Sequence, residues 1–370
     1  MLPTVDERRV ERWLGRETTE RIVAATEAWY GPPIPVAGMP GRVLAARGGH
    51  FVGRLRPSRF VRFADAAAMH TALAVKRWTR SQRLTMNAGF ASLSDLISEM
   101  TAGGKGQMIP FVKAGTAGIA ARSNSLWRVG ASPVAGAAGG TTGTGEARTR
   151  TTQGALGQAD AGSGDQLHLT TMVVQASVAG QMLLLYDRLW DMTHTMTVAP
   201  RSCDAANVPT RYQTAELAPG NFLSGEVTTV LPAATPTVTF DYVDQDGNNA
   251  TGAALSTIYS AAAVNTVPFT AGPWFYPLLA GDTGLRSLQN SANAVNLSAA
   301  MASGAVTWFI GHPLAFVPMG AANTPVILDG INSAFNLQRI YDDACLAFME
   351  IAKGATTATN WWGTIQAVSG

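Results

Sequence analysis

The feature that most constrains the fold is a series of short apolar segments, separated by turn residues, in the second half of the chain. Between Gly272 and Met319 an aromatic run is followed by the turn Ala280-Gly281-Asp282 and by segments that alternate or cluster apolar residues. Segments of this kind, bounded by Gly, Pro, Asn and Asp, are typical of strands in a packed sheet. The pattern predicts a mainly β protein with a β-sandwich or jelly-roll-like body.

We expect about ten strands in this body, which spans residues 167–370. The predicted strands are 167–177, 182–190, 222–231, 237–243, 250–259, 274–279, 285–297, 306–317, 344–351 and 361–368. Residues 344–351 are equally compatible with a helix, because a short apolar run does not distinguish a strand from a buried helical segment.

Three segments of different character precede the body. Residues 1–40 are expected to form an amphipathic helix over 4–30 and then a Pro-rich strap. Residues 41–100 are a basic, largely helical region, in which SLSDLISEM at 92–100 begins with a Ser cap. Residues 101–166 contain 15 glycines, which favours a long extended arm that is either disordered alone or ordered by neighbouring molecules.

Charged residues are scarce and unevenly distributed. Asp, Glu, Lys and Arg make up 14% of the chain, against about 25% in an ordinary soluble domain, and this favours a subunit that buries much of its exterior against neighbours. Residues 1–100 carry 15 basic and 9 acidic residues, whereas the remainder carries 12 and 16. A basic stripe at helical spacing is a candidate for non-specific contact with double-stranded DNA, the alternative being a solvated or interface-bound basic face. Its residues are Lys76, Arg77, Arg80 and Arg83.

No residue pattern predicts catalysis, a cofactor or a metal site. The acidic stretch from Asp241 to Asn248 resembles a calcium loop, but Gly247 and Leu255 do not satisfy the spacing that such a loop requires. A hairpin turn at 246–249 is the favoured interpretation. The two cysteines form no paired motif, the N-terminus is charged rather than apolar, and no apolar run reaches the roughly 20 residues of a membrane span. We therefore expect neither an enzyme nor a membrane protein.

Two local groups of residues combine tyrosine, aspartate and arginine. Tyr186-Asp187-Arg188 and 339–343 are expected to form charge-assisted hydrogen bonds that hold a strand end or an interface, with an acid–base site as the alternative. Six tryptophans are candidate anchors of an interface or of the core: Trp13, Trp29, Trp127, Trp274, Trp361 and Trp362. With its two neighbours, Trp274 is alternatively a stacking surface for carbohydrate.

From about Ser92 to the C-terminus, several sequence phrases resemble, in order, virion structural proteins of tailed bacteriophages. They are SLSDL (92–96), NSLWRVGASPVAG (124–136), MLLLYDRLW (182–190), PTRY (209–212), PLLAGDTGLRSLQ (277–289), TWFIGHPLAFVP (307–318) and RIYDDACLAF (339–348). Residues 1–90 do not join the match.

The resemblance implies a capsid shell protein, most directly a major capsid protein, that assembles with icosahedral symmetry and without catalysis. Its partners would be copies of itself, other virion proteins and packaged DNA, and it would be made in the host bacterial cytoplasm before joining the virion. A decoration (cement) protein and a β-sandwich tail or receptor-binding protein are the alternatives. The usual major capsid fold of these phages is α+β, with a long spine helix after an extended loop, and that fold is the alternative to the β-rich body.

Overall fold

The computed structural model describes residues 4–5, 61–62, 90, 92–101, 104–115, 122–141, 143–162, 164–203, 208–251, 256–258, 261–269, 274–331, 337–351 and 357–370. The chain divides into two compact units, Met1–Ala88 and Gly89–Gly370. In the first unit the described residues form an antiparallel pair, β1 (Thr4–Val5) with β2 (Val61–Arg62). Thr4 and Val5 are therefore extended, although they lie at the start of the predicted helix. The rest of that helix, the Pro-rich strap and the basic stripe lie outside the described residues.

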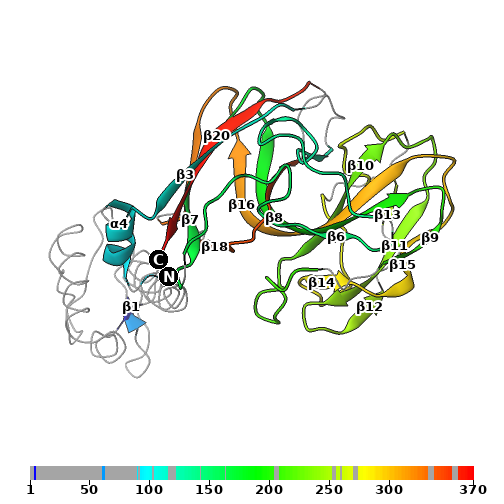
Figure 1. Ribbon diagram of the computed structural model, residues 1–370, viewed down its shortest axis with the longest axis horizontal. Coiled ribbons are helices and arrows are strands. Elements are labelled where there is room, and N and C mark those ends of the chain that lie inside the picture. The colour runs from blue at the N-terminus through cyan, green and yellow to red at the C-terminus, as the bar shows by residue number, and fades with distance from the viewer. Residues whose placement is uncertain are drawn as a thin grey trace. The chain divides into compact units, whose positions relative to one another are not determined.

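The second unit is built of antiparallel sheets, which confirms the prediction of a mainly β body (Figure 1). Its central sheet has the strand order β10 (Phe222–Thr229), β16 (Ala305–Met319), β8 (Gln181–Thr195), β19 (Leu346–Ile351) and β4 (Asn124–Ser125), and β6 (Glu146–Ala147) also pairs with β8.

Two further sheets complete the unit. The β11 sheet has the order β12 (Asn249–Thr251), β11 (Thr237–Asp244), β15 (Ser291–Leu297) and β9 (Pro200–Cys203), and β13 (Ser256–Thr257) and β14 (Leu285–Leu288) also pair with β11. The β20 sheet has the order β17 (Val326–Asp329), β7 (Leu167–Ala176), β20 (Trp361–Ser369), β3 (Gly106–Lys113) and β5 (Ala131–Ser132), and β18 (Gln338–Ile340) also pairs with β7.

The central sheet is buried on both of its faces. On β8, Leu184 and Tyr186 belong to the hydrophobic cluster that contains the β11 sheet, whereas Leu183 and Leu185 belong to the cluster that contains the β20 sheet. A strand covered on both faces has no polar side to present, so its sequence reads as a continuous apolar run rather than an alternation. This is why residues 182–190 are so apolar.

The predicted helix at 92–100 is confirmed as α4 (Leu93–Thr101), and the Ser92 hydroxyl accepts the Asp95 N–H at 3.0 Å as its cap. Its buried residue, Leu96, packs with Phe90 and Val368. Residues 167–190, by contrast, form β7 and the first part of β8. The Gly-rich segment is therefore succeeded by strands and not by the long spine helix of the α+β alternative.

The ambiguous segment at 344–351 is a strand, β19, from residue 346 onward, and residues 274–279 are irregular instead of forming the predicted strand. The reason lies in their contacts with β10. The Tyr276 N–H donates to the Leu223 carbonyl, and the Trp274 carbonyl accepts from the Ser224 hydroxyl. The predicted hairpin turn is confirmed, because Val243 of β11 pairs with Asn249 of β12 and the Asp244 carboxylate accepts two backbone N–H groups of the turn.

The Gly-rich segment differs from the expected arm, because its described residues from 122 to 162 pack on the body of their own chain. Leu126, Trp127 and Leu156 are all buried. A Cβ atom at Gly136 would lie 2.2 Å from the Trp127 ring, and one at Gly145 only 2.1 Å from a ring atom of another tryptophan, Trp190. Here glycine permits the backbone to lie directly on an aromatic ring. Close packing on tryptophan therefore explains part of the high glycine content of this segment.

One short loop connects the two ends of the central sheet. The Asn265 N–H donates to Val227 of β10 and the Asn265 carbonyl accepts from Ser125 of β4, at 2.8 Å in both cases. Two further bonds, Val227 N–H to Thr266 and Val267 N–H to Ser123, continue the connection. Both edges of the sheet thereby gain backbone partners in their own chain, which protects them from pairing with other strands.

Candidate functional site

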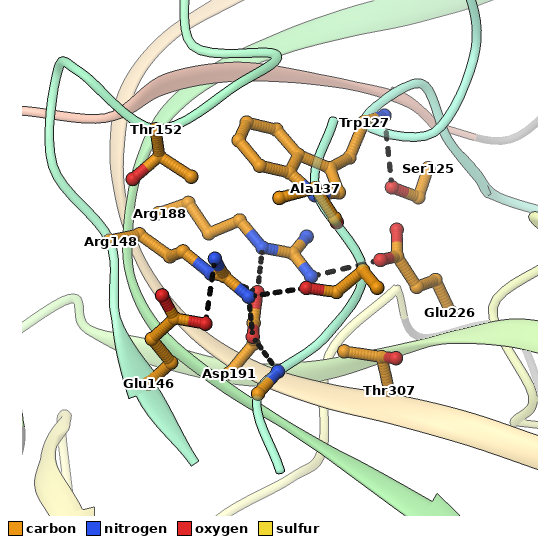
Figure 2. A network of polar contacts seen from close by, with 12 residues as sticks. Ser125, Trp127, Ala137, Glu146, Arg148, Thr152, Arg188, Asp191, Glu226 and Thr307 are labelled. Carbon is orange, nitrogen blue, oxygen red and sulfur yellow. Dashed lines mark hydrogen bonds and ion pairs between the residues drawn. The ribbon is translucent and has the colours of Figure 1, made fainter. Parts of the chain in front are cut away.

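The feature that stands out inside the central sheet is a network of ionised side chains (Figure 2). Arg148, Arg188, Asp191 and Glu226 are each 1% exposed or less. They come from the segment after β6, from β8 twice and from β10. Charges in the protein interior are tolerated only when they are paired and hydrogen-bonded, so the geometry of this network decides what it does.

Asp191 lies at the centre of the network. Its Oδ1 accepts from Arg148 Nη2 at 2.7 Å and from the Gly140 N–H at 2.8 Å. Its Oδ2 accepts from Arg148 Nε at 2.9 Å and from Arg188 Nε at 2.8 Å. Burial acts to raise the pKa of Asp191, but the two guanidinium groups outweigh it and the pKa lies below its usual value. Asp191 is therefore ionised and fully bonded.

A β-bulge makes this arrangement possible. In a regular strand, residues three apart such as 188 and 191 point to opposite faces. Here Arg188 pairs with Gly311 while Trp190 pairs with Ile310, so Leu189 is an extra residue on β8. A bulge shifts the alternation by one and re-aims the side chains on either side of it. Because of the bulge, Arg188 and Asp191 reach each other within one strand.

Arg188 extends the network toward β10. Its Nη2 donates to Glu226 Oε1 at 2.9 Å, and its guanidinium lies 4.3 Å from the Phe309 ring centroid and 5.0 Å from that of Trp127. Burial acts to lower the pKa of Arg188, but Glu226 and Asp191 outweigh it and raise the pKa. The side chain is held as a cation between two aromatic rings and two carboxylates.

Arg148 attaches the Gly-rich segment to the sheet. Besides its two bonds to Asp191, its Nη2 donates to the Ala138 carbonyl at 2.6 Å. Its Nη1 lies 3.1 Å from Glu146 Oε2, whose side chain is 58% exposed. The network thus begins at the surface and ends in the interior, and one arginine holds the described residues of 138–141 and 143–148 against β8.

A second buried pair adjoins this network. Arg211 Nε donates to Asp187 Oδ2 at 2.7 Å and its Nη2 donates to Oδ1 at 2.9 Å. Asp187 Oδ1 also accepts the Cys345 N–H at 2.8 Å, and Arg211 Nη2 donates to the Arg148 carbonyl at 2.6 Å. Burial opposes the charge of Arg211, but Asp187 raises its pKa. The two clusters therefore share backbone contacts.

Tyr212, the next residue after Arg211, packs in an aromatic group. Its ring stacks on His312 at 3.8 Å with an interplanar angle of 8°, and it meets Tyr341 edge-on at 4.7 Å. Its backbone φ is +56°, a left-handed conformation that costs a non-glycine residue free energy and is kept only when its surroundings impose it. Residues 209–212 thus supply an arginine to one cluster and an aromatic ring to another.

In these two clusters each of the three carboxylates, Asp187, Asp191 and Glu226, is bonded to an arginine and is 0% exposed. Groups placed in this way fix segments of the chain relative to one another, since a substrate has no access to them. Among the described residues, no group of three or more His, Cys, Asp or Glu is arranged to hold a metal ion. In the same part of the chain, no helix has the length and apolarity needed to cross a membrane.

The predicted anchor residues have different positions. Trp127 and Trp361 are 1% exposed or less and belong to the core of their own chain. Trp274 is partly buried against Phe222, and Trp362 is partly buried on the β20 sheet. Trp13 and Trp29, like the basic stripe, lie outside the described residues.

The charge-assisted bonds predicted for Asp187 and Arg188 are confirmed. Sequence reasoning missed Arg211 as the partner of Asp187 and Glu226 as a partner of Arg188. It also missed Asp191 and its partner Arg148. The sequence offered two hints of these clusters: Arg148 inside a Gly/Thr-rich segment and Arg211 in PTRY. Neither position indicates which carboxylate the arginine pairs with.

Comparison with models of protein families, with curated proteins and with solved structures found no match to this chain.

Proposed function

We propose that this chain is a structural protein of a tailed-bacteriophage virion and that it serves as a capsid shell protein. The observation that carries the proposal is the combination of few charges with large apolar side chains on the surface. Charged residues are 14% of the chain, while Met108, Ile327, Val134 and Val230 are 72%, 66%, 56% and 55% exposed. A surface of this kind favours association, because a solitary soluble protein is normally protected by charge.

The buried ion network supports the same role. A shell subunit must present its contact surfaces in a fixed arrangement, since many copies have to fit one another. The network holds residues 138–141 and 143–148, together with β10, against β8 through Asp191 and Arg188. Buried ionic groups of this kind specify one packing arrangement in some proteins. Its carboxylates serve as bonds between segments, which fits a protein without catalysis, cofactor or metal.

Electron microscopy of the purified protein in negative stain, together with light scattering, tests the proposal. Closed shells, tubes or sheets are the expected products, with other virion proteins supplied if the chain alone stops at small oligomers. A protein that stays monomeric at every concentration, alone and with its co-expressed virion partners, contradicts the proposal. A chain that binds only to preformed shells would instead be a decoration protein.

A tail or receptor-binding protein that recognises carbohydrate has less support. Sugar binding of the expected kind needs exposed rings. Tyr276 is 0% exposed, Phe275 is 37% exposed, and Trp274 packs against Phe222 and Phe316. The rings at 274–276 therefore contribute mainly to packing.

If the shell interior faces DNA through the basic stripe, reversing its charge is expected to reduce the DNA content of particles. The change is Arg77→Glu, Arg80→Glu and Arg83→Glu in one chain, because each lost phosphate contact weakens non-specific binding in a salt-dependent way. The measurement is the ratio of DNA to protein in purified particles. The matched control reverses Arg8, Arg9 and Arg12, which changes the net charge equally outside the stripe. Full particles from the stripe variant would contradict the DNA-facing role.

A further inference from the structure

One face of the β20 sheet is open and nearly uncharged. Across its four neighbouring strands, the register aligns Pro110 of β3, Thr364 of β20, Val173 of β7 and Ile327 of β17 in one row. The rows on either side include Met108 and Val112 of β3 and Trp362 of β20. We call these outward positions of residues 108–112, 362–366, 171–175 and 327–329 the β20 face. Asp329 is its one ionisable residue.

The two sides of this sheet have opposite environments. Its inward residues, such as Phe111, Met172 and Ile365, are 2% exposed or less. On the outward side, Met108 is 72%, Ile327 66% and Val112 48% exposed. An antiparallel sheet with one face in water normally places polar and charged residues there. The β20 face instead carries exposed apolar side chains among uncharged polar ones. Its uncharged polar positions are Thr171, Gln175, Thr364 and Gln366. Large exposed apolar side chains grouped in this way are typical of an interaction surface.

Trp362 is an outward side chain that is held in place. Its indole N–H donates to Gln175 Oε1 at 2.8 Å, so the ring of a β20 residue is tied to the neighbouring strand β7. A ring fixed in this way loses little conformational entropy when a partner covers it.

We propose that the β20 face binds the same face of a second copy of this chain in a two-fold symmetric, sheet-on-sheet contact. The inference rests on the proposed function, because it takes self-assembly as given and identifies one surface that carries it. Pairing identical faces brings like charges together, which is destabilising for a charged surface. A face whose one ionisable residue, Asp329, lies at its edge strand avoids this repulsion.

The shape of the face also suits a second sheet. The central positions, Thr364 and Val173, are small, and larger side chains such as Trp362 and Ile327 flank them. Two sheets that pack face to face lie about 10 Å apart and interdigitate their side chains. With a two-fold axis between β20 and β7 and parallel to them, β3 of each copy lies over β17 of the other. The strand that carries the exposed Met108 in one copy is then covered by the strand that carries Ile327 in the other.

The size of the face predicts a weak contact. Four strands about 4.8 Å apart, each contributing about five residues of 3.4 Å, give a flat area of roughly 300 Å² per copy. Interfaces below about 1,200 Å² in total are typical of weak or transient association. We therefore expect reversible self-association that becomes strong only when an assembly repeats the contact many times.

The side chains of the face favour a protein over a carbohydrate as its partner. Aliphatic side chains such as Met108 and Ile327 gain free energy from burial against protein, and they offer no hydrogen bond to the hydroxyl groups of a sugar.

The test is the double substitution Val112→Lys and Ile327→Lys, with Val198→Lys and Val230→Lys as the matched control on exposed apolar residues outside the face. All four positions are at least 40% exposed, so both variants are expected to fold, which circular dichroism checks. Sedimentation equilibrium of the full chain measures the association constant. We expect it to fall about 100-fold or more in the face variant, because binding would bury uncompensated ammonium groups, and to stay within about threefold in the control.

Equal association constants for the face variant, the control and the unsubstituted chain would overturn the proposal. So would binding of an oligosaccharide panel by a monomeric chain through this face, because a glycan would then be its occupant. Electron microscopy distinguishes a failure of the face contact from a failure of the proposed shell role. Shells formed equally well by the face variant refute the face contact and leave the shell role standing. Self-association through the face without shells or tubes refutes the shell role alone.

Discussion

Asp191→Asn is expected to lower the free energy of unfolding by about 4 kcal/mol, the range observed when one member of a buried ion pair is removed. The substitution keeps the size of the side chain but removes the charge that Arg148 and Arg188 share, and it leaves two guanidinium groups in the interior with fewer acceptors. Asp191 is 0% exposed and accepts four hydrogen bonds. Chemical denaturation at pH 7, followed by tryptophan fluorescence, measures the change.

The matched control is Glu146→Gln, which breaks the ion pair at the exposed end of the same network. Because the Glu146 side chain is 58% exposed, water already solvates its charge, and the expected loss is below about 1 kcal/mol. Equal losses from the two variants would mean that the buried charges contribute no more than a surface pair, and would contradict the central role of Asp191 in holding the network together.

The second unit is expected to lose stability as the pH falls from about 6.5 to about 4, because three histidines are held neutral inside it. Burial is the main cause that lowers the pKa of His168, His194 and His312, in each case from 6.5 to about 4. The unfolded chain binds more protons than the folded one between these values. The contribution of each neutral histidine to the free energy of unfolding is therefore fully present above pH 6.5 and is lost as the pH falls toward 4.

The hydrogen bonds of His194 require the neutral form. Its Nε2 lies 2.8 Å from the Val198 carbonyl and therefore donates, while its Nδ1 accepts from the Trp308 indole N–H at 3.3 Å. A protonated ring would carry a hydrogen on Nδ1 and direct it at another donor. The shift of the His194 pKa from 6.5 to about 4 corresponds to about 3 kcal/mol of stability that is lost when the ring is fully protonated.

Urea denaturation at pH 7, 5.5 and 4.5 measures the effect, and His194→Gln tests its origin. Glutamine also offers a donor and an acceptor but does not titrate. The variant is therefore expected to be less stable at pH 7 and to lose about 2 kcal/mol less than the unsubstituted chain between pH 7 and pH 4.5. Two buried carboxylates also contribute to the pH dependence: the pKa of Asp191 is lowered, whereas burial raises the pKa of Asp187. Both carboxylates are present in both chains, so their contributions cancel in the comparison with His194→Gln. The same pH dependence in both chains would refute the assignment to His194.

Local sequence signals were sufficient for much of the fold. Strands β7, β10, β11 and β20 follow from alternation and turn residues, β8 follows from an apolar run after a turn, and α4 follows from the Ser92 cap. All of these signals act within a few residues. The same signals failed at 274–279, where an aromatic run typical of a strand is held in an irregular conformation by hydrogen bonds with β10.

The ion network could not be predicted from the sequence. Arg148 and Asp191 are 43 residues apart, and Arg188 and Glu226 are 38 apart, so their pairing depends on which strands become neighbours and on the bulge at Leu189. The Gly-rich segment shows the same limit. Its composition allows both a free arm and a backbone packed on Trp127 and Trp190, and only the tertiary contacts distinguish them.

The sequence alone therefore determined the β character of the body, the position of its one described helix and its scarcity of charge, since these depend on residue type and local spacing. The tertiary structure decided which charges meet, which tryptophans are buried and which sheet face is left open. Those outcomes depend on contacts between distant segments, and the free energy of such contacts is set by burial that no local pattern records.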